Sequence, residues 1–186
     1  MGRWEPDAAG RLREAAMALY AEQGFEGTTV AQIADRAGVT ARTFFRHFAD
    51  KREVLFAGSE ELERRMVDAL SAAPRAAGPM GAIAVALLSA AELFADRRDH
   101  SRRRQAVIAA TPELREREFI KMASLVAAFT EALRQRGVEP DIASLAAETG
   151  VAVFRVAFER WVAGPGDADL AQVMRGALAD LSGLTA

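Results

Sequence analysis

The stretch from Thr29 to Lys51, TVAQIADRAGVTARTFFRHFADK, constrains the fold of this chain more than any other. Thr29 is a good helix N-cap, and Gln32 three positions later completes a capping box. Apolar residues then recur at helical spacing as far as Gly38, and glycine readily adopts the left-handed conformation that ends a helix. Because Thr40 is a second N-cap candidate, the sequence predicts two short helices around a glycine turn.

The second of these helices, expected over residues 41–48, has two chemically different faces. Phe44 and Phe48 are four residues apart and therefore share one side. The opposite side presents hydrogen-bond donors, namely Arg42, Thr43, Arg46 and His47. An apolar back and a donor-rich front, on a helix that follows a glycine turn, indicate a helix-turn-helix that reads DNA. The alternative is a helical hairpin in an ordinary bundle, with its charges facing water.

The segment from Arg11 to Leu55 resembles the N-terminal domain of the TetR/AcrR family of transcriptional regulators. The resemblance is carried by Leu12, Ala15, Ala16, Leu19, Tyr20, Gly24, Phe25, Thr28, Thr29, Val30, Ile33, Ala34, Ala37, Gly38, Val39, Thr43, Phe48 and Lys51. It implies a homodimeric DNA-binding regulator, and a repressor is the expected type. Such proteins often carry a phosphate-binding tyrosine where this chain has Phe45, so that contact is absent or replaced.

Together, the helix pattern and the resemblance define a candidate DNA-binding set. Arg42 and Arg46 are expected to face the major groove, while Thr40 and Lys51 are expected to contact phosphates. The full set is Thr29, Arg36, Thr40, Ala41, Arg42, Thr43, Phe45, Arg46, His47 and Lys51.

Overall charge argues weakly against a nucleic-acid partner, because the chain has a net charge of −2 and a pI of about 5.8. The local charge is different. Residues 36–52 contain five arginine or lysine residues, and Asp50 is the one acidic residue among them. Phosphate attraction depends on charge within a Debye length of about 8–10 Å, so this basic segment outweighs the total.

Composition predicts the fold class. Of the 186 residues, 51% are hydrophobic and 27% charged, which suits a globular protein that buries a core. Runs of strand-forming residues are few, so we expect an all-α fold of about nine helices. A three-helix helix-turn-helix domain is expected over residues 1–56, and a larger helical bundle for ligand binding and dimerisation over residues 57–186.

Caps and breaks predict the remaining helices. Asp7 caps the first, which Gly24 ends, and Asp50 with Glu53 begins the fourth, which runs from Lys51 to Ala73. A fifth helix over 80–95 is apolar on nearly all sides and is therefore expected to be buried. The later helices are expected from within or just after the arginine run 97–104, from Thr111-Pro112 to Arg136, from Asp141 to Ala163, and from Asp169 to Leu181.

Residues 97–104, RRDHSRRR, contain five arginines and have three interpretations. They are a solvated helix start, a clamp for an anionic ligand, or a second contact with the DNA backbone. Catalytic and metal chemistry is not indicated. The two histidines, His47 and His100, are too few for a metal cluster, there is no cysteine, and no glycine-rich loop follows a strand. We therefore expect no enzyme activity and no cofactor.

TetR-like regulators keep an effector pocket in the C-terminal domain. The segments ATPELREREFIKM and RVAFERW resemble a branch associated with acyl-coenzyme A-like ligands, for which an apolar seam takes the acyl chain and arginines take the phosphates. The candidate ligand-binding residues are Met66, Leu70, Leu87, Phe94, Phe119, Met122, Val126, Phe129, Phe154, Phe158 and Trp161. Met66 and Leu70 lie on the fourth helix, which is expected to link ligand and DNA.

The last two helices are expected to pair with those of a second copy in a four-helix bundle. The candidate interface residues are Leu145, Thr149, Ala152, Val156, Leu170, Met174, Leu178 and Leu181. The N-terminus has no apolar signal segment, so the cytoplasm is the expected location. The leading hypothesis is therefore a repressor that an apolar or acyl-coenzyme A-like effector releases from a pseudo-palindromic operator. The alternatives are a ligand-binding bundle whose hairpin is structural, and a small helical enzyme.

Overall fold

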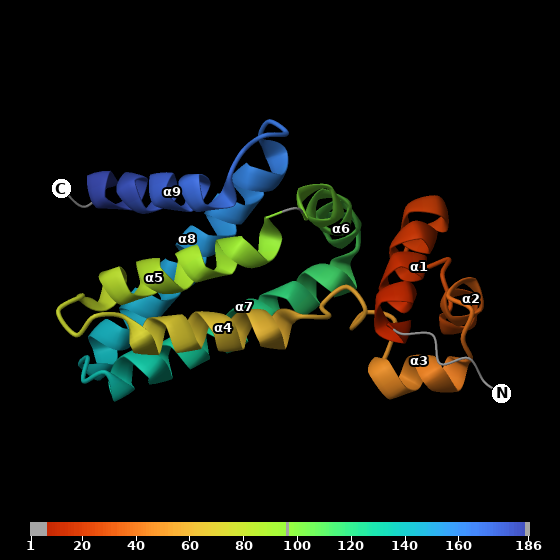
Figure 1. Cartoon of the computed structure of the whole chain (residues 1–186), viewed down its shortest axis with the longest axis horizontal. Coiled ribbons are helices and arrows are strands. Elements are labelled where there is room, and N and C mark those ends of the chain that lie inside the picture. Colours follow the sequence, from red (N-terminus) through yellow and green to blue (C-terminus); the bar gives the residue numbers. More distant parts are fainter. Residues whose placement is uncertain (1–6, 96, 185–186) are drawn as a thin grey trace. The chain divides into compact units, whose positions relative to one another are not determined.

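The computed structural model describes residues 7–95 and 97–184, and this part of the chain contains nine α-helices, one 3₁₀ helix and no strand (Figure 1). The all-α prediction is therefore confirmed. The helices are α1 (Ala8–Gln23), α2 (Val30–Arg36), α3 (Ala41–His47), α4 (Ser59–Ala72), α5 (Pro79–Ala91), η1 (Glu92–Phe94), α6 (Arg98–Ala110), α7 (Pro112–Gln135), α8 (Pro140–Ala163) and α9 (Leu170–Leu184).

The chain forms two compact units that are not simply consecutive in sequence. The first contains the residues up to Ala57 together with Arg103–Glu118. The second contains Gly58–Arg102 and the residues from Phe119 onward. The chain therefore passes from one unit to the other after Ala57, within α6 and within α7.

Local capping chemistry shapes the first unit as the sequence predicts. Thr29 Oγ1 accepts from the backbone N–H of Gln32 at 3.2 Å, and Gln32 Oε1 accepts from that of Thr29 at 2.8 Å. Gly38 has a φ of 68°, a left-handed conformation that suits glycine, and it turns the chain between α2 and α3. Arg11 on α1 donates from Nε to the carbonyl of Ala37 at 3.1 Å, which satisfies a carbonyl at the end of α2.

The core of the first unit combines residues that are far apart in the sequence. Leu12 of α1, Ile33 of α2 and Phe44 of α3 are fully buried in it. Ile108 of α6 and Leu114 of α7 are also fully buried in this same core. The three-helix motif is therefore completed by a helical corner that lies about 50 residues further along the chain.

The prediction of a helix from Lys51 was wrong, because α4 begins at Ser59. Asp50 does cap the backbone N–H groups of Arg52 and Glu53, but turns follow rather than a helix. Val54, Leu55 and Phe56 are all buried in the first core, and the backbone N–H groups of Leu55 and Phe56 donate to carbonyls three residues back, as in turns, rather than four back as in an α-helix. Gly58, at φ 90°, then precedes α4, which lies entirely in the second unit.

The corner between α6 and α7 holds the 51–57 segment by polar contacts. Arg104 donates from Nε to the carbonyl of Leu55 at 2.7 Å, and its guanidinium lies 5.1 Å from the ring centroid of Phe56. Arg117 donates from Nε to Glu53 Oε1 at 2.6 Å. Burial lowers the pKa of Arg104 from its ordinary value, and the neighbouring Glu118 opposes this shift.

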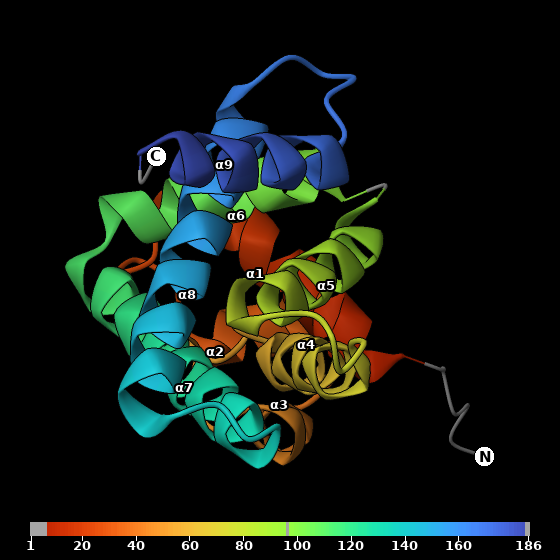
Figure 2. The same cartoon turned by 90° about the vertical axis from the view of Figure 1, so that its left-hand side faces the viewer.

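In the second unit, α5 packs against α4, α8 and α9 (Figure 2). Its fully buried side chains include Ile83 and Leu87, which confirms the prediction of a buried fifth helix. Helices α5 and α8 approach closely at Gly150, where an added Cβ would lie 2.6 Å from Ile83 Cγ2. In the described residues no single helix is long and apolar enough to cross a membrane, and only the bent pair Pro79–Phe94 and Arg98–Ala110 together meets that criterion.

Truncation of Leu114 tests whether the α6–α7 corner belongs to the first core. Leu114→Ala should destabilise the protein by about 2–5 kcal/mol, because the fully buried side chain leaves a cavity. It should also speed amide hydrogen exchange in α1–α3. Ile120→Ala, on the same helix but half exposed, is the control and should have little effect on either measurement. Unchanged exchange in α1–α3 of Leu114→Ala would show that these helices fold without the corner.

Two glycine substitutions should shift stability in opposite directions. Gly150→Ala should destabilise the protein by about 1–3 kcal/mol, because its methyl group meets the buried Ile83. Gly176→Ala on α9 meets no atom within 4 Å and should stabilise by about 0.5–1 kcal/mol, since alanine favours helix. Urea unfolding of both variants measures the difference. A gain in stability from Gly150→Ala would contradict the close approach of α5 and α8.

Candidate nucleic-acid interface

Helix α3 separates its apolar and donor residues as the sequence predicts. Phe44 is fully buried, and Phe48, which follows the helix, is also buried. Thr43 is half buried, and the exposed residues of the helix are Ala41, Arg42, Phe45, Arg46 and His47. Thr40 Oγ1 accepts from the backbone N–H of Thr43 at 3.2 Å and so fixes the start of the helix. The structure thus presents two arginines, a histidine and a phenyl ring on one short, firmly anchored helix.

The three candidate threonines already have partners in the protein. Thr29 Oγ1 donates to Gln32 Oε1 at 3.0 Å in addition to accepting from Gln32 N. Its single hydroxyl proton is therefore engaged, and a phosphate contact would require the hydroxyl to rotate. Thr40 Oγ1 lies 3.2 Å from Thr43 Oγ1, where either hydroxyl can be the donor. A phosphate that contacts Thr40 would have to replace only the hydroxyl of Thr43, which is uncharged and therefore a weaker partner than a phosphate.

Arg36 is paired with an acidic residue on α1. Its Nη1 and Nη2 donate to the two carboxylate oxygens of Glu22 at 2.5 and 2.7 Å, in a bidentate arrangement. The hydrogen bond from Arg36 lowers the pKa of Glu22, and the carboxylate raises that of Arg36. Both side chains are exposed, so this pair is screened by solvent. DNA phosphates would have to replace Glu22 to engage Arg36 fully.

Lys51 has an internal role that its position in the motif did not reveal. Its Nζ donates to the carbonyls of Phe25 and Thr28 at 2.8 and 3.0 Å and lies 4.2 Å from the ring centroid of Phe25. Tyr20 donates its hydroxyl to the carbonyl of Lys51 at 2.6 Å, and burial raises the pKa of Tyr20. These bonds hold the turn that leads into α2. The predicted phosphate contact would use the remaining donor capacity of the ammonium group.

Sequence reasoning missed the side chains that position α2 from outside it. Besides Arg11, Gln23 on α1 donates from Nε2 to the carbonyl of Gly27 at 2.9 Å and to Gln32 Oε1 at 3.2 Å. The hydrogen bond from Arg11 and the bond from Gln23 to Gly27 both have a backbone carbonyl as the acceptor. Every residue has such a carbonyl, so no sequence pattern marks the partner.

The candidate ligand-binding residues lie in the second unit, most of them in its packed core. The buried ones are Met66, Leu70, Leu87, Phe129, Phe154 and Trp161. Four are partly buried against that core: Phe94, Met122, Val126 and Phe158. The rings of Phe94, Phe158 and Trp161 form a cluster with centroids 5.2–6.2 Å apart. Phe119 differs, because 61% of its surface is exposed, and ligand binding at these residues stays a prediction.

The candidate dimer residues divide between an open face and a covered one. On α8, Leu145 is 66% exposed, Ala152 and Val156 are exposed, and Thr149 is half buried. On α9, Leu170 and Met174 are buried in the core of the same unit, while Leu178 and Leu181 are partly buried against it. The open stripe of this set therefore lies on α8, and pairing of two copies stays a prediction.

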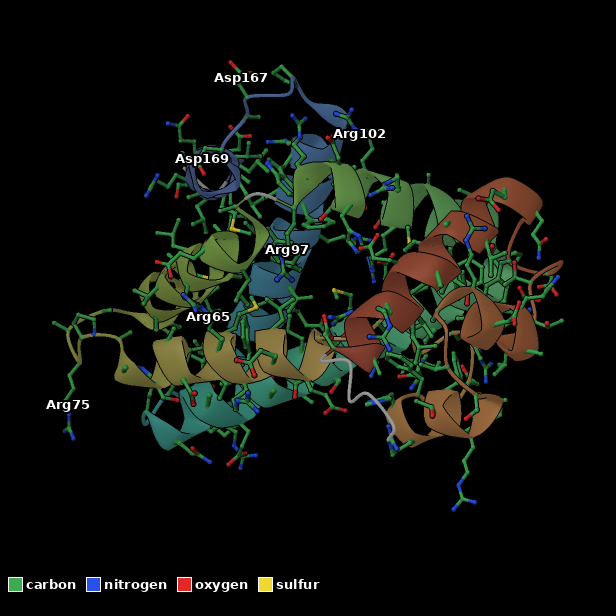
Figure 3. The ribbon with its side chains drawn as sticks, turned by 45° about the vertical axis from the view of Figure 1, so that its right-hand side comes forward. Arg65, Arg75, Arg97, Arg102, Asp167 and Asp169 are labelled. Atoms are coloured by element: carbon green, nitrogen blue, oxygen red, sulfur yellow. The ribbon has the colours of Figure 1, made fainter. Side chains whose placement is uncertain are left out.

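The arginine run begins α6, and several of its side chains close helix ends. Arg98, which is buried, donates to the carbonyls of Trp161, at 2.9 Å, and Gly164. Arg102 donates to the carbonyl of Val162 at 3.1 Å, beside the loop that carries Asp167 (Figure 3). These bonds satisfy carbonyls at the C-terminal end of α8. The interpretation as a simple solvated helix start therefore fails for Arg98, whereas Arg97 is exposed.

Two family models match the chain. Residues 12–57 match "Bacterial regulatory proteins, tetR family", which covers α1 from Leu12 onward, α2, α3 and the turns that follow them. Residues 77–185 match "MftR C-terminal domain", which is more than half of the chain. The boundaries agree with the position of the α2–α3 pair and with the start of α5 near Pro79.

Characterised relatives share the N-terminal part. The HTH-type transcriptional regulator TcmR of Streptomyces glaucescens is 42% identical over 72 residues, which are 39% of this chain and 31% of that protein. The HTH-type transcriptional repressor KstR2 of Mycobacterium tuberculosis is 43% identical over 63 residues, which are 34% of this chain and 30% of that protein. The chain therefore matches less than a third of the length of either relative.

Solved structures share the fold over nearly the whole chain. A TetR-family transcriptional regulator from Syntrophomonas wolfei superposes with a TM-score of 0.69 at 16% identity, covering 96% of this chain and 94% of the other. FadR from Bacillus subtilis, in complex with stearoyl-CoA, gives 0.63 at 19% identity and covers 92% and 96%. At this level of sequence identity, these matches show that the fold is shared and nothing more. The two family models show that the chain belongs to the tetR family of bacterial regulatory proteins and has an MftR-type C-terminal domain.

Proposed function

We propose that this protein is a transcriptional repressor that binds a pseudo-palindromic operator as a homodimer, with α3 as the recognition helix. The observation that carries the proposal is the face of α3. Arg42 and Arg46 are exposed on the side opposite the fully buried Phe44, on a helix whose start is capped by Thr40. Arginine can donate two hydrogen bonds to O6 and N7 of guanine, the commonest specific contact in the major groove.

Three other candidate residues, Arg36, Thr40 and Lys51, serve orientation rather than sequence reading in this proposal. Thr40 and Lys51 contact phosphates, and Arg36 joins them when phosphate displaces Glu22. DNA binding resides in residues 1–56, with the α6–α7 corner completing their core, and residues 57–186 otherwise serve ligand binding and dimerisation. A DNA-binding repressor acts where the chromosome is, so we place it in the cytoplasm.

The proposed effector is a small apolar or acyl-coenzyme A-like molecule. The support is the aromatic and aliphatic composition of the second core and the fold shared with FadR, whose solved complex contains stearoyl-CoA. A ligand changes DNA affinity only when it binds two conformations with different affinity. Met66 and Leu70 on α4 are both fully buried, so a ligand that rearranges this core would act on α4. The link to α3 then runs through the turns at 51–58 rather than through one continuous helix.

Alanine substitution of the two arginines tests the recognition helix. Arg46→Ala and Arg42→Ala should each weaken binding to DNA from upstream of the protein's own gene by about 1–3 kcal/mol per lost guanine contact. Fluorescence anisotropy measures the affinity, and thermal unfolding should be nearly unchanged because both side chains are exposed.

Arg75→Ala is the matched control for the loss of one positive charge. Arg75 is exposed and points away from the ribbon in the loop after α4 (Figure 3). Arg75→Ala should leave the affinity for this DNA unchanged. If Arg42→Ala and Arg46→Ala behave like Arg75→Ala, α3 is not the recognition helix.

A charge on the open face of α8 tests the homodimer. Val156→Glu should give a species near 20 kDa in sedimentation at micromolar concentration, whereas the wild type should sediment near twice that mass. Ser144→Glu is the control, because Ser144 is exposed on the polar side of the same helix. The monomeric variant should lose operator affinity while its α1–α3 unit stays folded. A wild-type species near 20 kDa would refute the dimer.

A further inference from the structure

The exposed surface of α3 consists of three parallel rows, of which only two carry hydrogen-bond donors. Residues four apart on a helix lie nearly above one another, so Arg42 and Arg46 form a cationic row. A second row contains Thr43 and His47, on one side of the arginines. The row on the other side is apolar and consists of Ala41 and Phe45. Any partner surface that binds the arginine row must therefore also contact the apolar row beside it.

Phe45 is a large apolar side chain that is exposed, and its ring also contacts a buried neighbour. Its surface is 58% exposed, and its ring meets that of Phe44 edge-on, with centroids 5.4 Å apart and an interplanar angle of 82°. Phe44 itself is fully buried and cannot move without opening the core. The contact with Phe44 restricts the motion of the Phe45 ring, which reduces the entropy that the ring would lose on contact with a partner.

The chemistry of a phenyl ring decides which part of DNA it can contact favourably. It has no donor for a phosphate oxygen, and placing it against a phosphate would remove water from an anion without replacing the hydrogen bonds. Within the major groove, the apolar group on the base edges is the C5-methyl group of thymine, and phenylalanine is one of the side chains that contact it. Cytosine, adenine and guanine present no methyl group there.

Resting on the proposed function of α3, we propose that Phe45 is a specificity-determining residue that packs on the C5-methyl group of a thymine. Because the Ala41–Phe45 row directly borders the Arg42–Arg46 row, this thymine belongs to a base pair adjacent to the guanine that the arginines read. Ala41 leaves room for the methyl group beside the ring. Each half-site of the operator therefore contains a thymine that is recognised by its methyl group alone.

Replacing thymine with uracil removes only that methyl group and so tests the contact directly. The probe is a duplex that the wild-type protein selects from a random-sequence pool, remade with deoxyuridine at one thymine position at a time. One position in each half-site should lose affinity by about fourfold, the factor that corresponds to burying one methyl group. Changing that position in both half-sites should multiply the two losses.

Two variants separate the phenyl contact from other effects of the methyl group. Phe45→Ala should bind thymine and uracil duplexes equally at that position, whereas Phe45→Leu, which keeps an apolar side chain, should retain most of the difference. Circular dichroism should show that both variants fold, because the ring is exposed. The inference is overturned if wild type binds every uracil duplex as well as its thymine parent, or if Phe45→Ala keeps the full preference for thymine.

The selection and the Arg46→Ala variant distinguish this failure from failure of the proposed function. One outcome is that the selected sequence needs Arg46 for binding and yet binds equally well without any thymine methyl group. That result would leave α3 as the recognition helix and would overturn only the role of Phe45. A pool from which no preferred sequence emerges overturns both.

Discussion

The complete burial of Phe44 is the constraint on which the exposed face of α3 depends. Helix α3 is only seven residues long, so one anchored side chain fixes its rotation about its own axis. With Phe44 directed into the core, Arg42 and Arg46 are directed away from it. The Thr40 cap and the left-handed Gly38 fix where the helix begins. Position and rotation together determine which side chains a groove would meet.

Local rules made much of the first unit predictable from the sequence. The caps at Asp7, Thr29 and Thr40, and the turn at Gly38, involve residues within four positions of each other, so their chemistry is visible in the sequence. The two faces of α3 followed from the period of the α-helix in the same way. The error at Lys51 also has a local cause. A capping residue was recognised, but Gly58, whose left-handed conformation interrupts a helix, was not weighed against it.

The rest of the candidate site was hidden because it depends on distant or backbone partners. Nothing near Ile108 or Leu114 in the sequence indicates that they complete a core formed by α1–α3. The basic residues were assigned outward roles because charge suggests a charged partner. In the structure Lys51, Arg98 and Arg104 each donate to backbone carbonyls. Arg136 shows the same behaviour, since it donates to carbonyls of Leu70, Ser71, Ala73 and Pro74 at the end of α4.

The contribution of Ile108 and Leu114 to the first core has a consequence during synthesis of the chain. A ribosome releases α1, α2 and α3 well before the α6–α7 corner, so the growing chain carries an unfinished core while about 60 further residues are added. During that interval Val54, Leu55 and Phe56 lack the partners that later cover them. The protein thus completes its first unit only after most of the chain has left the ribosome, and a chain that stops earlier leaves apolar surface exposed to chaperones and proteases.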